Sequence, residues 1–220
     1  MRAAEIASMI KPRYLAGFTG HRKVENPDVI RQSLASEFAR LKTTIETRGG
    51  VLELYTSAAY GADLIACEEA GKLGIPIHLV LPKPVVLMKG GSEVDKHAGF
   101  AADFWKDGTF LESEWDRAHR LIENAARGGQ GGTLRLTPGT QTEPECYYDA
   151  GLHMLDPIDV LIAVWNEQPA EGLGGTEHMV SLARKRWLPL VIISAQDGKT
   201  KDEHLDRLAD PDDLSRRIFD

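Results

Sequence analysis

The stretch IDVLIAVW, residues 158–165, decides the fold, because it is an almost unbroken apolar run of eight residues. A run of this length without polar alternation is typical of a strand buried on both faces, as in a parallel sheet. A polar, glycine-rich loop follows at 166–175, then a helical segment at 176–187 and another apolar run at 188–193. This order of strand, loop, helix and strand is the repeating unit of an α/β protein.

The same unit recurs upstream. Apolar runs predict strands at 14–18, 51–55, 75–81 and, more weakly, 133–137. Apolar residues spaced three and four apart predict helices between them, starting after the caps Asn26 and Thr142 among others. Strand-helix alternation implies parallel strands joined by right-handed crossovers. We therefore predict one Rossmann-like domain, with a doubly wound, mainly parallel sheet flanked by helices.

Two segments fall outside this pattern. Residues 82–108 show no clean periodicity, and a stretch of this length is usually functional or mobile. Its basic residues Lys83, Lys89 and Lys96 suit either a lid that closes over phosphates or a solvated loop. The end of the chain is highly charged with few apolar residues, so we expect the domain to occupy 1–196 and a tail or peripheral helix to occupy 197–220.

Composition narrows the class of function. The chain has 220 residues, is 42% hydrophobic and carries a net charge of -7, which argues against a general binder of duplex DNA. The cysteines, Cys67 and Cys146, form no CxxC pair, and the histidines show no metal-ligand spacing. No apolar run reaches the ~18 residues of a membrane span. We expect a cytoplasmic protein without metal or cofactor, for which nucleic acid is an unlikely partner.

The functional signal lies in three loops that follow predicted strands. In an open α/β sheet, ligands bind beyond the carboxyl ends of the strands. The three loops read TGHR at 19–22, SAAYGAD at 57–63 and GLGGTE at 172–177, so small and hydroxylated residues meet at one edge of the sheet. We expect the ligand-binding residues to be Thr19, Gly20, His21, Arg22, Ser57, Gly61, Asp63, Trp165, Gly174, Gly175 and Thr176.

The third loop has the features of an anion site. Gly174 and Gly175 allow the backbone to approach a ligand closely, and Thr176 begins a helix whose first N–H groups are free. Glu177 in the first turn suits the helix dipole but repels a phosphate, so we assign it to a ribose hydroxyl or to acid–base chemistry. Plain helix capping explains this loop equally well when it is considered alone.

The other two loops supply charge and shape. Arg22 is a natural phosphate clamp, whereas Ser57 and Asp63 either shape the ribose side or cap a buried helix. Trp165 ends the best strand at the ligand edge, and one of Tyr147 and Tyr148 either stacks on a base or packs in the core. The sequence contains neither GxGxxG nor GxxxxGK[ST], so it predicts neither a dinucleotide enzyme nor a P-loop ATPase.

Taken in order, these pieces resemble the SLOG superfamily, which includes the Smf/DprA-like proteins and the Lonely-guy phosphoribohydrolases. The matching pieces are GFTGHR (17–22), TSAAYGAD (56–63), IPIHLVLP (75–82), and DVLIAVWN with GLGGTEHMVSLAR (159–184). The resemblance runs from Leu15 to about Ser194. It implies a Rossmann-like fold, a pocket for a nucleotide or a nucleotide-derived ligand, and self-association, most simply as a homodimer.

One departure from the family pattern separates three functional hypotheses. Lonely-guy enzymes carry PGGxGTxxE with a catalytic glutamate, but here Met179 stands three residues after Thr176 and no proline precedes the glycines. This favours binding, as sensor or carrier, of a nucleoside phosphate or ADP-ribose-like molecule. The alternative is hydrolysis or transfer at an N-glycosidic bond with Glu177 as the catalytic residue. A third hypothesis is a DNA-processing or scaffold partner.

Overall fold

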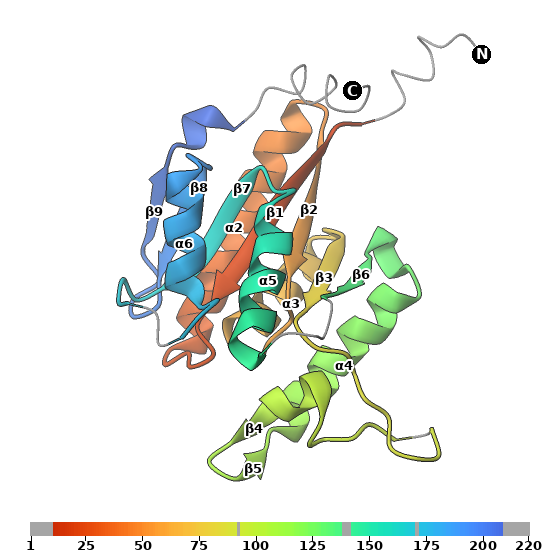
Figure 1. The fold of residues 1–220 in the computed structure, drawn as a ribbon. Helices are drawn as coiled ribbons and strands as arrows, with labels where there is room; N and C mark the ends of the chain where they lie inside the picture. The colour runs from red at the N-terminus through yellow and green to blue at the C-terminus, as the bar shows by residue number, and fades with distance from the viewer. Residues whose placement is uncertain (1–10, 92, 138–141, 170–171, 209–220) are drawn as a thin grey trace, which may run out of the picture.

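The computed structural model describes residues 11–91, 93–137, 142–169 and 172–208. Its main sheet has seven strands in the order β6-β3-β2-β1-β7-β8-β9, and every neighbouring pair is parallel except β8 and β9 (Figure 1). This confirms the predicted α/β fold with a mainly parallel sheet. The strands are β1 (Arg13–Gly20), β2 (Val51–Thr56), β3 (Ile77–Leu81), β6 (Leu134–Leu136), β7 (Val160–Trp165), β8 (Leu190–Ser194) and β9 (Thr200–Glu203).

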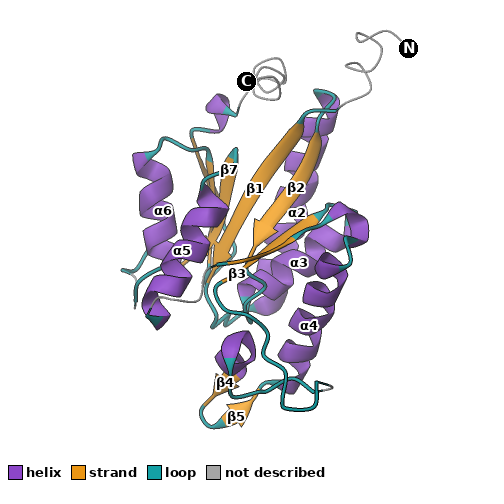
Figure 2. Ribbon diagram, turned by 45° about the vertical axis from the view of Figure 1, so that its right-hand side comes forward, coloured by secondary structure: helices purple, strands orange, loops and turns teal. Residues whose placement is uncertain are grey.

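Helices cover both faces of the sheet (Figure 2). One face carries α5 (Glu143–Leu155) and α6 (Thr176–Lys185), and the other carries α2 (Pro27–Thr47) and α3 (Ala62–Lys72), with α4 (Glu112–Ala126) beside α3. All six residues of β7 are buried, as the apolar run at 158–165 predicts for a strand covered on both faces. The predicted apolar stripe of α2 is also buried: Ile30, Leu34, Phe38, Leu41 and Ile45.

The topological switch point of the sheet lies between β1 and β7. These strands are neighbours, with Thr19 opposite Ala163 and Gly20 opposite Val164. The chain leaves β1 toward α2 on one face and leaves β7 toward α6 on the other. Loops that diverge in this way open a crevice at the carboxyl ends of the strands, which is where ligands bind in doubly wound sheets.

The non-periodic segment is a docked insertion between β3 and α4. It contains a 3₁₀ turn at Gly99–Phe104 and a small hairpin of β4 (Trp105–Lys106) and β5 (Thr109–Phe110). In Figure 1 it lies beyond the carboxyl ends of the strands. Phe100 and Phe104 are fully buried and pack edge-on against each other, and Phe104 packs in the same way on Trp115 of α4. The insertion is therefore held by its own aromatic cluster rather than by regular secondary structure.

The C-terminal segment differs from the expected tail or peripheral helix. Residues 200–203 form β9, which pairs antiparallel with β8 at the edge of the sheet. The sequence TKDE carries no apolar signal because this strand is mostly exposed. It is held by backbone bonding and by the ion pair of Glu203 with Arg184 at 2.8 Å. Residues 209–220 lie outside the described part of the chain.

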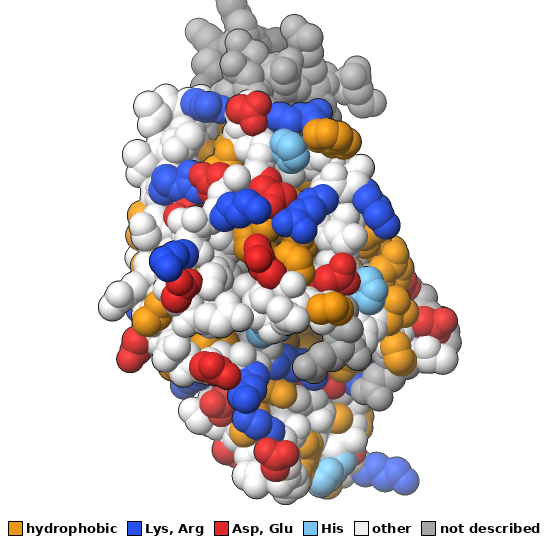
Figure 3. Space-filling view, turned by 90° about the vertical axis from the view of Figure 1, so that its left-hand side faces the viewer, with side chains coloured by type: hydrophobic (Ala, Val, Ile, Leu, Met, Phe, Trp, Pro, Cys, Tyr) orange, Lys and Arg blue, Asp and Glu red, His pale blue; other side chains and the backbone are white. Residues whose placement is uncertain are grey.

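The face at this edge carries Lys and Arg interspersed with Asp and Glu (Figure 3). Arg184 pairs with Glu203 and Arg40 pairs with Asp202, so positive charge here is locally neutralised. A broad positive surface for duplex nucleic acid is not found on this face. None of the described helices is long and apolar enough to cross a membrane.

Candidate functional site

The β2–α3 loop is held by Asp63, which lies in the first turn of α3. This carboxylate is buried, and its Oδ2 accepts hydrogen bonds from Ser57 Oγ at 2.7 Å and Thr56 Oγ1 at 3.2 Å. Burial raises the pKa of Asp63 to about 6, although the two hydroxyl donors, a bond from the Ala59 backbone and the charge of Arg22 oppose the rise. Ser57 and Asp63 thus hold the loop in shape.

The same loop needs unusual backbone conformations. Ala58 has a φ of 55° and Gly61 has a φ of 92° with a ψ of -130°, a region open essentially to glycine. A Cβ on Gly61 would lie 2.3 Å from the carbonyl oxygen of Arg22. The glycine therefore lets the β2–α3 loop touch the β1–α2 loop, which brings two of the three predicted loops together.

Arg22 lies between two aromatic rings at the end of β1. Its guanidinium carbon is 5.5 Å from the centre of the Tyr60 ring and 5.4 Å from that of Tyr147. Its Nη2 is 3.8 Å from Asp103 Oδ2, which is too long for a hydrogen bond. The side chain remains 43% exposed. Arg22 is thus oriented by cation–π contacts while part of its surface stays open to a ligand.

Asp103 of the insertion lies at the centre of the charged cluster. Its Oδ1 accepts a bond from Lys83 Nζ at 2.8 Å and another from the Tyr147 hydroxyl at 2.5 Å. Burial raises the pKa of Tyr147, and the charge of Asp103 together with its hydrogen bond raises that pKa further. The side chain of Asp103 is only 5% exposed, yet its Oδ2 has no hydrogen-bond partner.

The α6 loop closes the site from the β7 side. Gly174 has a φ of 83°, and a Cβ there would lie 2.6 Å from the backbone nitrogen of Tyr148, so this glycine seats the loop on α5. Gly175 and Thr176 begin α6, and Thr176 Oγ1 lies 3.5 Å from Thr19 Oγ1. Glu177 follows in the first turn, partly exposed. Residues 170–171 of this loop are outside the described part.

Trp165 and His21, both predicted to bind the ligand, make contacts within the protein. Trp165 is buried in a cluster with Val180 and Ile192, and its indole donates to the carbonyl of Gln168 at 3.0 Å. His21 Nε2 accepts a bond from the backbone nitrogen of Asn166 at 3.1 Å. The His21 bond ties the loop after β1 to the loop after β7, whereas the Trp165 bond lies within the loop after β7.

The cluster includes residues that the sequence does not identify as members of the site. The sequence predicts Lys83 in a lid or a solvated loop and Tyr147 in base stacking or the core, whereas both residues bond Asp103. Asp103 itself carries no sequence signal, because it sits in a segment without periodicity and its partners are 20 and 44 residues away. The aromatic spacing of Phe100 and Phe104 is the one local hint that the insertion is docked.

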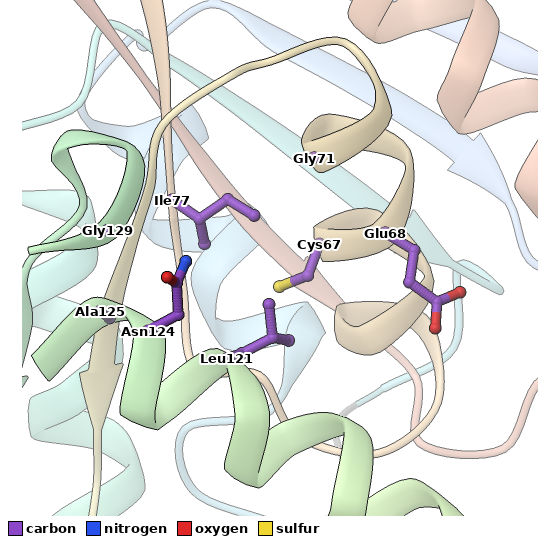
Figure 4. A pocket seen from close by; sticks show the side chains of 8 residues that line it. All are labelled: Cys67, Glu68, Gly71, Ile77, Leu121, Asn124, Ala125 and Gly129. Atoms are coloured by element: carbon purple, nitrogen blue, oxygen red, sulfur yellow. The ribbon is translucent and has the colours of Figure 1, made fainter. Parts of the chain in front are cut away.

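A cavity of about 290 Å³ lies elsewhere, between α3 and α4 (Figure 4). Cys67, Ile77, Leu121 and Asn124 point into it, whereas Glu68 points away. Burial raises the pKa of the Cys67 thiol well above its ordinary value, so this sulfur is a poor nucleophile. The cavity lies near the start of β3 and is separate from the crevice. In the described ranges no group of three or more His, Cys, Asp or Glu is placed to hold a metal ion.

Comparison with known proteins supports the fold. No protein-family model and no curated protein matches the sequence. Among solved structures, the chain is similar to DNA processing protein A from Helicobacter pylori, whose structure describes a single-stranded DNA binding mode. The two share 14% identity with a TM-score of 0.52, covering 97% of this chain and 83% of that one.

DNA processing protein A (DprA) from Streptococcus pneumoniae is also similar, with 12% identity and a TM-score of 0.49, covering 97% of this chain and 57% of that one. At such identities the likeness to the Helicobacter pylori protein concerns the fold. The chain has a Rossmann-type α/β fold, and over nearly its whole length this fold is similar to that of DNA processing protein A from Helicobacter pylori. The fold that the strand-end motifs imply is confirmed.

Proposed function

We propose that the protein binds a nucleotide or nucleotide-derived ligand, such as a nucleoside phosphate or an ADP-ribose-like molecule, in the crevice between β1 and β7. The observation that carries this proposal is the position of Arg22. Its guanidinium lies over the rings of Tyr60 and Tyr147 just after the carboxyl end of β1, and Thr19 at that end lies 3.5 Å from Thr176 at the start of α6. A cation, aromatic faces and a helix N-terminus in one crevice match the phosphate and base of such a ligand.

The phosphate would lie against the backbone N–H groups at the start of α6, near the hydroxyls of Thr19 and Thr176. Arg22 would donate to it from the β1 side. Ser57 and Asp63 would act through the shape of the β2–α3 loop, because they bond each other. Glu177 is then available for a hydroxyl of the ligand. This arrangement fits a sensor or a carrier that binds its ligand intact.

Two further functions have specific support. Glu177 lies in the first turn of α6 beside the proposed phosphate position, which suits N-glycosidic hydrolysis if a ribose carbon reaches it. The DprA-like fold, together with cations over tyrosine rings, suits single-stranded nucleic acid, where stacking and a basic groove provide affinity. The net charge of -7 opposes this second function.

Equilibrium dialysis against nucleoside monophosphates and ADP-ribose, with chromatography of both chambers, tests the proposal. We expect one intact ligand to be retained. Release of free base would favour the hydrolase, and Glu177→Gln should then abolish the release. If no ligand is retained and single-stranded DNA shows a salt-dependent gel shift, nucleotide binding would be replaced by binding of single-stranded nucleic acid as the function.

Arg22→Ala should weaken binding by about 1.5–3 kcal/mol, because it removes a charge-assisted bond. Lys23→Ala is the matched control, since Lys23 is the next residue in the chain and its side chain is 79% exposed. We expect Lys23→Ala to leave the affinity unchanged. Equal affinity of the Arg22→Ala protein and the wild type would remove Arg22 from the site.

A further inference from the structure

The Asp103 carboxylate has one unused acceptor in a buried position. A buried polar atom without a hydrogen-bond partner is costly, and such atoms call for a specific explanation. Asp103 Oδ2 is of this kind, since the side chain is only 5% exposed and Arg22 Nη2, at 3.8 Å, is within ion-pair but not hydrogen-bond distance. An incoming donor would satisfy this oxygen.

The other oxygen limits what this donor can be. Oδ1 already accepts from Lys83 and from Tyr147, so the carboxylate offers one oxygen rather than two. A guanine edge presents adjacent N–H donors that fit both oxygens of a carboxylate. The edges of adenine and cytosine present a single exocyclic amine, and carboxylates accept from that amine of cytosine in known recognition pairs. A single free oxygen therefore suits a base with one amine.

The position of Asp103 favours the base over the ribose. Lys83 follows the carboxyl end of β3, and β3 lies two strands from β1 in the sheet. Neighbouring strands are ~4.8 Å apart, so the end of β3 is roughly 10 Å from the end of β1. A phosphate at the start of α6 would thus place the ribose over β1 and β2 and the base near Asp103. The rings of Tyr60 and Tyr147 lie against Arg22, whose Nη2 is 3.8 Å from Asp103 Oδ2.

We infer that Asp103 Oδ2 accepts a hydrogen bond from the exocyclic amine of the bound base, so that the site selects adenine or cytosine nucleotides. The inference rests on the proposed function and adds the specificity-determining residue. It also explains a negative charge in a phosphate-binding crevice, because that charge faces the base and is balanced by Lys83 and Arg22.

Two pairs of probes test the inference on the wild-type protein. Adenosine 5′-monophosphate and purine riboside 5′-monophosphate differ only in the 6-amine, and cytidine and uridine 5′-monophosphates differ at the 4-position. Equilibrium dialysis should show about 10- to 100-fold tighter binding of the amine-bearing member of at least one pair, as expected for a bond to a charged acceptor. Equal affinities within both pairs would overturn the inference while leaving nucleotide binding in place. Retention of none of the four probes, together with no retention of ADP-ribose, would overturn both.

Asp103→Asn gives a sharper readout than loss of affinity. The amide oxygen is needed where Lys83 and Tyr147 donate, so the amide nitrogen takes the place of Oδ2 and becomes a donor. The preference should then shift at least about 10-fold toward uridine 5′-monophosphate, whose 4-oxygen accepts. Asp107→Asn, on the exposed hairpin turn of the same insertion, should leave the preference unchanged. An unchanged preference in Asp103→Asn would mean that Asp103 only neutralises its cations.

Discussion

The α6 loop and the β3–α4 insertion both contact α5 at Tyr147, but they bring different chemistry to the crevice. The α6 loop seats Gly174 against the backbone of Tyr147 and offers N–H groups and the Thr176 hydroxyl. The insertion reaches the Tyr147 hydroxyl with Asp103 and brings a buried charge. The first region is built from backbone and is visible as a short motif. The second is built from side chains that are distant in the sequence, so only the folded chain shows it.

This comparison requires that the insertion be as firmly packed as the sheet, and truncating its aromatic core tests that requirement. Phe104 is fully buried among Tyr60, Phe100 and Trp115. Phe104→Ala should lower the free energy of unfolding by about 3–5 kcal/mol, as large cavities in cores do. Phe38→Ala on α2, also fully buried, should cost a similar amount in urea denaturation. A loss below about 1 kcal/mol for Phe104→Ala alone would show a loosely attached insertion.

The second prediction concerns the charge buried in the strand-end loop. The pKa of Asp63 is raised from 3.8 to about 6, so between these values the folded state binds more protons than the unfolded state. Stability should therefore fall as pH rises through this window. The difference corresponds to about 3 kcal/mol.

Asp63→Asn retains an acceptor for Ser57 and Thr56 but does not titrate. Urea denaturation at pH 4, 5, 6 and 7 should show a smaller decline for this variant than for the wild type. Asp116→Asn on the exposed side of α4 should follow the wild type. Parallel pH profiles for Asp63→Asn and the wild type would mean that the carboxylate is not strained by burial.

The third prediction tests the backbone contact between two strand-end loops. Gly61→Ala forces a side chain into a glycine conformation and against the Arg22 carbonyl, so it should cost about 2–3 kcal/mol. Gly71→Ala in α3 meets nothing within 4 Å and should stabilise by about 0.5–1 kcal/mol through helix propensity. Thermal melts of both variants distinguish the cases. Gly61→Ala melting at the wild-type temperature would mean that the two loops are not in close contact.

The sequence predicted the parts of the molecule that follow a local period. The run at 158–165 and the stripe on α2 are buried as expected, and Gly174 and Thr176 lie where the motif places them. Asp103 and β9 could not be predicted, since neither depends on periodicity. The position of Asp103 follows from packing of the insertion, and β9 depends on backbone bonds to β8.

Helix caps also show that the sequence can predict a position without predicting the hydrogen bonds made there. Asn26 and Thr142 both stand at the N-cap positions that the sequence predicts, yet their side chains behave differently. Thr142 makes a capping box with Glu145, and its two hydrogen bonds hold the pKa of Glu145 below the ordinary value. Asn26 makes no cap bond and donates instead to the carbonyl of Gln196 at 3.1 Å.

The last and smallest predicted effect follows from this difference. Thr142→Ala should lower the free energy of unfolding by about 1 kcal/mol, because the first turn of α5 loses its cap. Asn26→Ala should cost less, since the first turn of α2 loses no bond from that side chain. Urea denaturation at neutral pH measures both variants. Equal losses of unfolding free energy in the two variants would show that the cap position matters more than the hydrogen bond. The stability of the first turn of α5, near the contacts with the α6 loop and the insertion, would then not depend on the bonds to Glu145.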